Sequence, residues 1–127
     1  MVVDTSILLA VLFNEEHGPW AADVLREHSR HLRMSTVNYA EALILICDRQ
    51  PHLFEELRSA IEASAIRLLP PTREQAETAA AARHRYPLNL GDCFAYALAK
   101  HEDCPLLTLD RDFRKTDIEV IRPGASR

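Results

Sequence analysis

Five acidic residues of this sequence stand where a strand is expected to end or a helix to begin. Carboxylates that come together repel one another and raise each other's pKa unless a cation neutralises them. Oxygen ligands without a paired His or Cys favour Mg²⁺ or Mn²⁺ over zinc. Such a group predicts a metal site that positions a water molecule and stabilises negative charge on a phosphodiester. The five residues are Asp4, Glu41, Asp92, Asp110 and Asp112.

Four of these acids also have an ordinary structural role available, and for Asp110 and Asp112 this role is the formation of a turn. Asp4 is able to cap the helix that follows it, although Ser6 is expected to do so, with the helix beginning at residue 7. Asp92 fits the third helical position of a capping box that begins at Asn89. None of these roles excludes a place in a metal site, so both interpretations stay open at this stage.

Glu41 is less easily explained as a solvated helical charge. Val37 lies four residues before it, and Ile44 and Leu45 lie three and four residues after it. These positions share its helical face, so the carboxylate is expected to project from an apolar surface. An acid in that setting favours a partner.

The elements that must position these acids alternate between short apolar strands and amphipathic helices. Strands separated by helical crossovers predict a mainly parallel sheet of four or five strands, covered on both faces, in a three-layer α/β/α sandwich. The functional crevice of such a sheet lies outside the carboxyl ends of its strands. The expected strands are 2–3, 32–34, 66–69, 106–109 and 118–121, and the expected helices are 7–13, 18–28, 37–47, 53–63, 73–85 and 90–102.

Composition sets bounds on the class of protein. The chain has 127 residues, of which 47% are hydrophobic and 27% charged, so we expect one globular domain over residues 1–127. It contains no apolar run of the roughly 20 residues that a membrane span needs, and no signal peptide is recognisable at its start, which predicts a soluble, cytoplasmic protein. Three cysteines without metal-binding spacing suit a reducing compartment, and each is expected to be a small buried residue.

Several other chemistries are disfavoured. The net charge of −4 argues against a protein that coats a polyanion, so any contact with nucleic acid must be local. Arg111, Arg114 and Lys115 lie near the acids and could contact substrate phosphates. Six scattered His residues form no zinc motif or catalytic triad, and three Gly residues cannot form a phosphate-binding loop.

Four segments carry a resemblance to a known family. Val3-Asp4-Thr5-Ser6, Tyr39-Ala40-Glu41, the segment 90–95 and the segment 107–113 are similar, in order and spacing, to the four acidic motifs of PIN-domain ribonucleases. More narrowly, they resemble the VapC toxins of toxin–antitoxin pairs. The resemblance implies a Mg²⁺-dependent endoribonuclease, with Mn²⁺ as a possible substitute, that forms a homodimer. It also implies the toxin of a type II pair, inhibited by a VapB-like antitoxin that wraps around it.

The resemblance also assigns roles to individual residues. Asp4, Glu41 and Asp92 match the first three acids of the family and would serve as metal ligands with a fourth acid. Small hydroxyl residues stand beside the acids in the family, and Arg111 is expected to contact substrate. The matching hydroxyl positions here are Thr5, Ser6 and Thr108.

The fourth acid is ambiguous, because Asp110 and Asp112 both fall where the family carries it. An extended chain would point Thr108, Asp110 and Asp112 to the same side. We expect a turn instead, because Asp-Arg-Asp leaves the apolar strand, and a turn would carry Asp112 away from Asp4. This favours Asp110 as the metal ligand, with Asp112 holding Arg111 or a backbone N–H in place.

Two other functions stay open on the sequence alone. One is a metal-dependent phosphohydrolase of another kind, such as a flap nuclease or a small-molecule phosphatase. The other is a catalytically idle α/β binding module, which would be indicated if the acids bound neither Mg²⁺ nor Mn²⁺.

Overall fold

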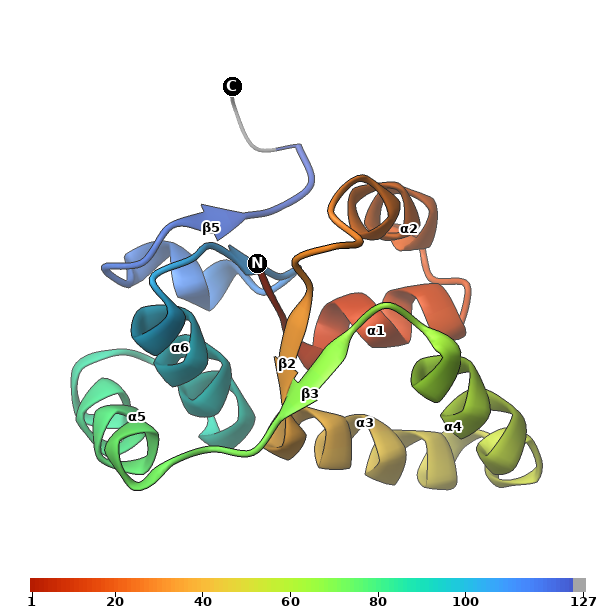
Figure 1. The fold of residues 1–127 in the computed structure, drawn as a ribbon, viewed down its shortest axis with the longest axis horizontal. Coiled ribbons are helices and arrows are strands. Elements are labelled where there is room, and N and C mark those ends of the chain that lie inside the picture. Colours follow the sequence, from red (N-terminus) through yellow and green to blue (C-terminus); the bar gives the residue numbers. More distant parts are fainter. Residues whose placement is uncertain (125–127) are drawn as a thin grey trace.

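A computed structural model describes residues 1–124 and shows a five-stranded parallel sheet between two layers of helices (Figure 1). The spatial order of the strands is β3-β2-β1-β4-β5, which leaves β1 in the centre. The strands are β1 (Val2–Val3), β2 (Arg33–Ser35), β3 (Arg67–Leu69), β4 (Leu106–Leu107) and β5 (Val120–Ile121). The helices are α1 (Thr5–Leu12), α2 (Gly18–Glu27), α3 (Thr36–Arg49), α4 (Phe54–Ala63), α5 (Arg73–Arg85) and α6 (Leu90–Glu102), with short 3₁₀ helices η1 (Pro51–Leu53) and η2 (Arg111–Lys115).

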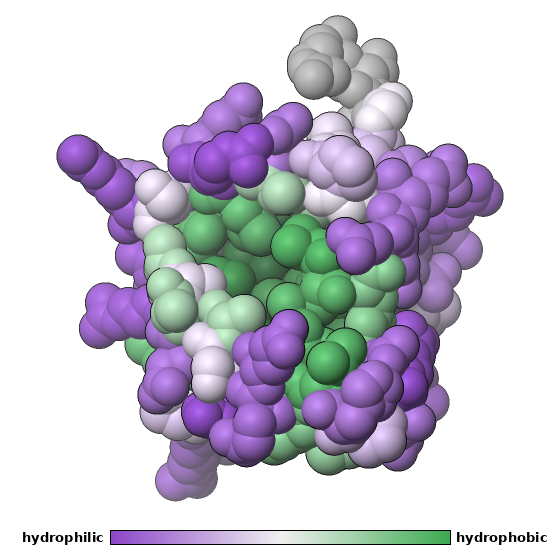
Figure 2. Space-filling view, turned by 90° about the vertical axis from the view of Figure 1, so that its right-hand side faces the viewer, coloured by the Kyte–Doolittle hydropathy of each residue, from purple (hydrophilic) through white to green (hydrophobic). Residues whose placement is uncertain are grey.

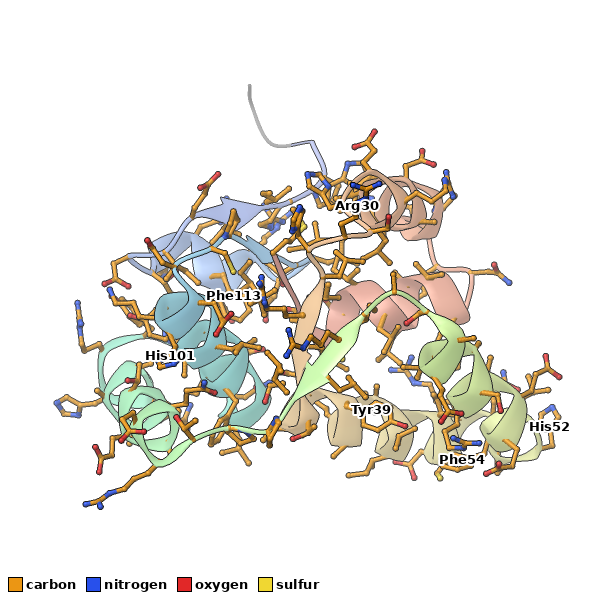
Figure 3. All side chains as sticks on the ribbon, viewed as in Figure 1. Arg30, Tyr39, His52, Phe54, His101 and Phe113 are labelled. Atoms are coloured by element: carbon orange, nitrogen blue, oxygen red, sulfur yellow. The ribbon has the colours of Figure 1, made fainter. Side chains whose placement is uncertain are left out.

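Alternate residues of the central strands feed two separate hydrophobic clusters. Val3 and Leu107 join a cluster with residues of α1, α2, α3 and α4. Val2 and Leu106 join a second cluster with residues of α5 and α6, and with Phe113 of η2, which is fully buried (Figure 3). This alternation follows from the two-residue period of a strand, and the two-sided burial confirms the predicted three-layer α/β fold.

The first helix begins two residues earlier than the sequence suggested. Asp4 is its N-cap residue, and the Asp4 carboxylate accepts a hydrogen bond from the Ile7 backbone N–H. Ser6 lies inside the first turn and is not the cap, so that expectation is wrong. The physical reason is that the Ser6 hydroxyl instead donates to Asp4 and accepts from the Leu109 backbone N–H.

The strands are also shorter or shifted relative to the predictions. β4 ends at Leu107 and not at Leu109, because the Leu109 N–H donates to the Ser6 hydroxyl instead of joining the sheet. β5 begins at Val120 and not at residue 118, β3 begins at Arg67, and β2 is displaced by one residue. The helices over 73–85 and 90–102 are as predicted, and Ser35 caps α3.

Two further expectations from the sequence concern membrane spans and the cysteines. No helix among residues 1–124 combines the length and apolar character that a bilayer span requires. The three cysteines are free, and only Cys93 is buried, whereas Cys47 is exposed on α3 and Cys104 is intermediate. The expectation that all three are buried is therefore wrong, because Cys47 lies on the solvent side of its helix.

Candidate active site

Asp4 is the most deeply placed acid at the carboxyl edge of the sheet, with 3% of its surface exposed. Its Oδ1 accepts hydrogen bonds from the Ser6 hydroxyl at 2.6 Å and from the Ile7 N–H at 3.3 Å, and its Oδ2 accepts one from the Thr108 hydroxyl. Burial raises the pKa of Asp4 to about 6, an effect that outweighs these hydrogen bonds. Three donors leave lone pairs on the carboxylate free, so a fixed Asp4 is still able to bind a cation.

Two hydroxyl groups connect Asp4 to the chain that leaves β4. The Ser6 hydroxyl accepts from the Leu109 N–H at 3.0 Å, and the Thr108 hydroxyl accepts from the Asp110 N–H at 2.9 Å. Thr108 is fully buried. The two hydroxyls therefore fix the start of the 3₁₀ turn relative to the central strand.

Glu41 is held on the other side of the site by Thr5. The Thr5 hydroxyl donates to Glu41 Oε1 at 2.5 Å, although the two residues are 36 positions apart. Glu41 also lines a hollow of about 780 Å³ with Val37, Ile44 and Leu45. The prediction that this carboxylate projects from an apolar surface is confirmed.

Asp92 occupies the predicted capping box. Its carboxylate accepts from the Asn89 N–H at 3.2 Å, and its own N–H donates to Asn89 Oδ1 at 2.8 Å. Burial is the largest cause that raises the pKa of Asp92 to about 7, followed by repulsion from Asp110, Asp4 and Glu41. The capping role is therefore confirmed, and the charge of the capping carboxylate still acts on the neighbouring acids.

Asp110 and Asp112 are separated by the turn. Asp110 is half-buried and close enough to raise the pKa of Asp4 and of Asp92 by repulsion. Asp112 is exposed in η2. The expected capping role is reversed, because Asp110 Oδ1 accepts from the Asp112 N–H at 2.8 Å.

The structure thus brings four of the five predicted acids to one edge of the sheet. Within residues 1–124, none of the four forms an ion pair with Lys or Arg. Nor does any set of three His, Cys, Asp or Glu side chains in this range stand close enough to enclose a metal ion by itself. The donor chemistry fits Mg²⁺, which keeps several water ligands and commonly takes one or two carboxylates from the protein. The four are Asp4, Glu41, Asp92 and Asp110.

The basic residues of this region lie on the outside. Arg111, Arg114 and Lys115 are all exposed on η2, directly after Asp110. The Arg114 Nε donates to the Arg111 carbonyl at 3.3 Å, which holds that side chain along the turn. Because Arg111 is exposed, its side chain is accessible to a ligand.

Two residues of the site were not singled out in the sequence. Asn38 is buried between α3, α1 and α6, and Gly91 packs directly against the Glu41 carboxylate. The available signals were a polar residue at the third position of an otherwise apolar helix start, and a glycine inside the first turn of a helix. Neither signal identifies its partner, since the partners lie 33 and 53 positions from Asn38 in the chain.

Comparison with known proteins identifies the class. The family model described as PIN domain matches residues 1–119 of the chain. Because the match spans most of the sequence and the fold agrees with it, the chain belongs to the PIN-domain family, and the resemblance seen in the four motifs is confirmed.

Relatives within that family narrow the assignment. The chain is 39% identical over 131 residues to ribonuclease VapC30 of Mycobacterium tuberculosis, covering 95% of this chain and 98% of the relative. It is 37% identical over 135 residues to ribonuclease VapC of Mycolicibacterium smegmatis, covering 95% and 99%. Within the PIN-domain family, the chain therefore belongs to the VapC ribonucleases.

Solved structures agree on the fold. Mycobacterium tuberculosis VapC20, described as a Sarcin-Ricin loop cleaving toxin, superposes with a TM-score of 0.82 at 20% identity, covering 96% of this chain and 98% of the other. A toxin–antitoxin complex from Klebsiella pneumoniae gives a TM-score of 0.78 at 24% identity, covering 96% of each chain. At these identities the similarity supports the fold alone.

Proposed function

We propose that this VapC-type ribonuclease is the toxin of a type II toxin–antitoxin pair and hydrolyses RNA phosphodiester bonds at Asp4, Glu41, Asp92 and Asp110, with Mg²⁺ as its cofactor. The observation that carries the proposal is the convergence of these acids, without a basic partner, at the carboxyl edge of a parallel sheet. The same edge carries the ligand crevice in other open parallel α/β sheets.

The four acids are proposed to bind the metal ion. Asp4, Asp92 and Asp110 repel one another, and they would hold the ion together with Glu41, which lies on α3. When bound, Mg²⁺ would activate a water molecule and neutralise charge on the scissile phosphate. Mn²⁺, with the same preference for oxygen ligands, is expected to substitute.

The neighbouring groups orient these acids. The Thr5 hydroxyl fixes Glu41, and the hydroxyls of Ser6 and Thr108 fix Asp4, so the carboxylates need little rearrangement when substrate arrives. The exposed Arg111 side chain supplies a cation that the acids themselves lack and would contact an RNA phosphate. Because this contact is local, it is compatible with a net charge of −4.

A VapB-like antitoxin is the proposed inhibitor. The similar proteins of known structure include toxin–antitoxin complexes, such as the one from Klebsiella pneumoniae. The side of the molecule that carries α1, α2 and α4 has a hollow with an apolar floor and a polar rim (Figure 2). Partly buried apolar side chains of this region include Val11, Leu12, Trp20, Val24, Phe54 and Leu57. An amphipathic antitoxin segment would cover this surface.

A homodimer is the proposed assembly. Ile44 on α3 and Leu90 at the start of α6 are 60% and 72% exposed, and both line the hollow beside Glu41. A second copy would remove this apolar surface from water. Sedimentation should give a dimer at micromolar concentration, and a strict monomer would contradict the assembly without affecting the catalytic proposal. The free cysteines suit the reducing cytoplasm, where we place this reaction.

An RNA-cleavage assay with and without Mg²⁺ tests the function. We expect cleavage of RNA with Mg²⁺ or Mn²⁺ and none with a chelator, and we expect Asp4→Asn to be inactive under both conditions. Cleavage of a small phosphate ester in place of RNA would favour another metal-dependent phosphohydrolase. A folded protein that binds neither Mg²⁺ nor Mn²⁺ and cleaves nothing would indicate an idle α/β binding module.

A further inference from the structure

Asn38 is a buried polar residue at the junction of the three helices that follow or carry the acids. It is the third residue of α3 and is 1% exposed. Its Nδ2 donates to the Gly91 carbonyl of α6 at 3.0 Å and to the Thr5 hydroxyl of α1 at 3.3 Å. One amide therefore connects the helix that Asp4 caps, the helix that carries Glu41 and the helix that carries Asp92.

The contact with Thr5 continues to the Glu41 carboxylate. The Thr5 hydroxyl oxygen lies 3.1 Å from the backbone carbonyl oxygen of Asn38 and 2.5 Å from Glu41 Oε1. A hydroxyl has a single proton, and the shorter, charge-assisted bond takes it. The hydrogen bonds therefore run in one direction, from the Asn38 amide to the Thr5 oxygen and from the Thr5 hydroxyl to Glu41.

Gly91 makes the second connection possible. A Cβ at this position would lie 2.6 Å from Glu41 Oε1 and 2.8 Å from Oε2. Any side chain there would displace the carboxylate, so glycine allows the first turn of α6 to pack directly against Glu41. The bond from Asn38 to the Gly91 carbonyl holds this turn in place, and Asp92 is the next residue of the turn.

The orientation of the Asn38 amide is determined by these partners. The opposite orientation would put Oδ1 against the Gly91 carbonyl, where two acceptors would face each other. As placed, Oδ1 is buried and has no hydrogen-bond partner among residues 1–124. A buried acceptor without a partner lowers stability, so Asn38 is a poorer choice for packing alone than an apolar residue of similar size.

We propose that Asn38 is a positioning residue of the nuclease, which sets the separation of the Glu41 and Asp92 carboxylates by joining Thr5 to the Gly91 turn. This inference rests on the proposed function, since it concerns the same acids. Asn38 touches neither substrate nor metal and acts through Thr5 and Gly91. Its removal should therefore disturb the metal site and the chemical step more than the binding of RNA.

The test compares Asn38→Leu with Gln75→Leu. Gln75 is a matched control, because it is also the third residue of its helix, is also a buried amide at 4% exposure, and lies on α5, which carries none of the four acids. For Asn38→Leu we expect kcat and the affinity for Mn²⁺ alone, measured by calorimetry, to fall by about 10–100-fold. The KM for RNA should change by less than about twofold, because uniform binding of the substrate is kept. Gln75→Leu should leave both the Mn²⁺ affinity and kcat at the wild-type values.

The outcomes separate this inference from the proposed function. A wild-type protein that neither binds Mn²⁺ nor cleaves RNA overturns the proposed function. A wild-type protein that does both, with a folded Asn38→Leu variant of equal Mn²⁺ affinity and equal kcat, overturns the role of Asn38 alone. Equal losses in Asn38→Leu and Gln75→Leu would also overturn it, because buried amides in general would then be responsible.

A second pair of variants keeps the test decisive if Asn38→Leu does not fold. Thr5→Val removes the hydroxyl that links Asn38 to Glu41 and keeps the side-chain shape, whereas Thr5→Ser keeps the hydroxyl. The proposal expects a larger loss of Mn²⁺ affinity and of kcat in Thr5→Val than in Thr5→Ser. Equal values in the two variants would contradict a connection through this hydroxyl.

Discussion

Helix α6 contacts two carboxylates, Asp92 and Asp117, whose surroundings shift their pKa values in opposite directions. Near its start, Asp92 faces Asp4, Glu41 and Asp110 and its pKa is raised to about 7. Tyr96 in the middle of the helix and Lys100 near its end both donate a side-chain hydrogen bond to Asp117, at 2.5 Å and 2.6 Å. These bonds lower the pKa of Asp117.

The difference shows which carboxylates are already satisfied by the protein. Asp117 has its cation and a hydroxyl donor within the fold, so it serves to hold the segment before β5 against α6. The acids at the other end receive hydrogen bonds only from neutral groups and repel one another. We therefore expect a cation from solution to stabilise them.

The largest expected effect comes from neutralising an acid of the unpaired group. Asp4→Asn and Asp92→Asn should each lower Mg²⁺-dependent RNA cleavage by at least about 100-fold, because a ligand charge is lost. The thermal midpoint should hold or rise, since repulsion is relieved and Asn also caps helices well. Asp117→Asn is the matched control and should retain activity. Wild-type cleavage rates in Asp4→Asn would refute the assignment of the site.

Growth of a bacterial host tests whether toxicity depends on the acids of the candidate site. Expression of the wild-type protein should arrest growth, whereas Glu41→Gln and Asp92→Asn should restore it because cleavage is lost. Colony counts after induction, with equal protein levels verified by immunoblot, measure the effect. If both variants stay fully toxic, the harm does not come from cleavage.

A smaller and more selective effect should separate Asp110 from Asp112. Asp110→Asn should weaken Mg²⁺ binding about tenfold or more, since Asp110 acts on both Asp4 and Asp92. Asp112→Asn should change both the Mg²⁺ affinity and the unfolding free energy little, because Asp112 is exposed in η2 and Asp110, not Asp112, caps the turn. Calorimetric titration of both variants decides the order, and a larger loss in Asp112→Asn would reverse it.

The stability of the metal-free protein should depend on pH in a direction set by the raised pKa values. Burial raises the pKa of Asp4 to about 6 and that of Asp92 to about 7 in the folded state, against about 4 in the unfolded state, so the folded state holds more protons between these values. Their contribution to the unfolding free energy is therefore fully present below about pH 4 and is lost as the pH rises through 6 and 7. Thermal unfolding should show a decrease of about 10 °C between pH 5 and pH 8.

Added Mg²⁺ sharpens that measurement. At pH 8 it should raise the thermal midpoint, because it binds the ionised acids of the folded state only. At pH 5 it should have little effect, since protons compete for the same oxygens. A midpoint that Mg²⁺ raises equally at both pH values would show that the ion binds elsewhere.

The smallest expected effect lies at the satisfied end of α6. Asp117→Asn should lower the unfolding free energy by about 0.5–1 kcal/mol, because the Lys100 side chain is about half exposed and solvent screens the pair. Denaturant unfolding measures this loss, which should disappear as the pH falls through the lowered pKa of Asp117. An equal loss of RNA cleavage would show that the two ends of the helix are coupled.

Much of the fold was predictable because it depends on local patterns. The boundaries of α5 and α6, the capping box at Asn89 and the parallel α/β/α arrangement follow from periodicity and capping residues. Strand ends were less predictable, since β4 ends where the Ser6 side chain takes over a hydrogen bond from 103 positions away. No local pattern contains that information.

Some features of the candidate site could likewise be predicted from the sequence, and others depend on the tertiary structure. The sequence alone determined which acids follow the strands, and a turn after β4 was enough to favour Asp110 over Asp112. Only the tertiary structure decided that Asp4 is the cap and the most buried acid, that Asp110 caps the turn itself, and that Asn38 joins Thr5 to Gly91. The physical reason is that burial, pKa and hydrogen-bond choice depend on which segments pack together. Thr108 and Asp4, 104 positions apart, meet only because β1 and β4 are adjacent in the sheet.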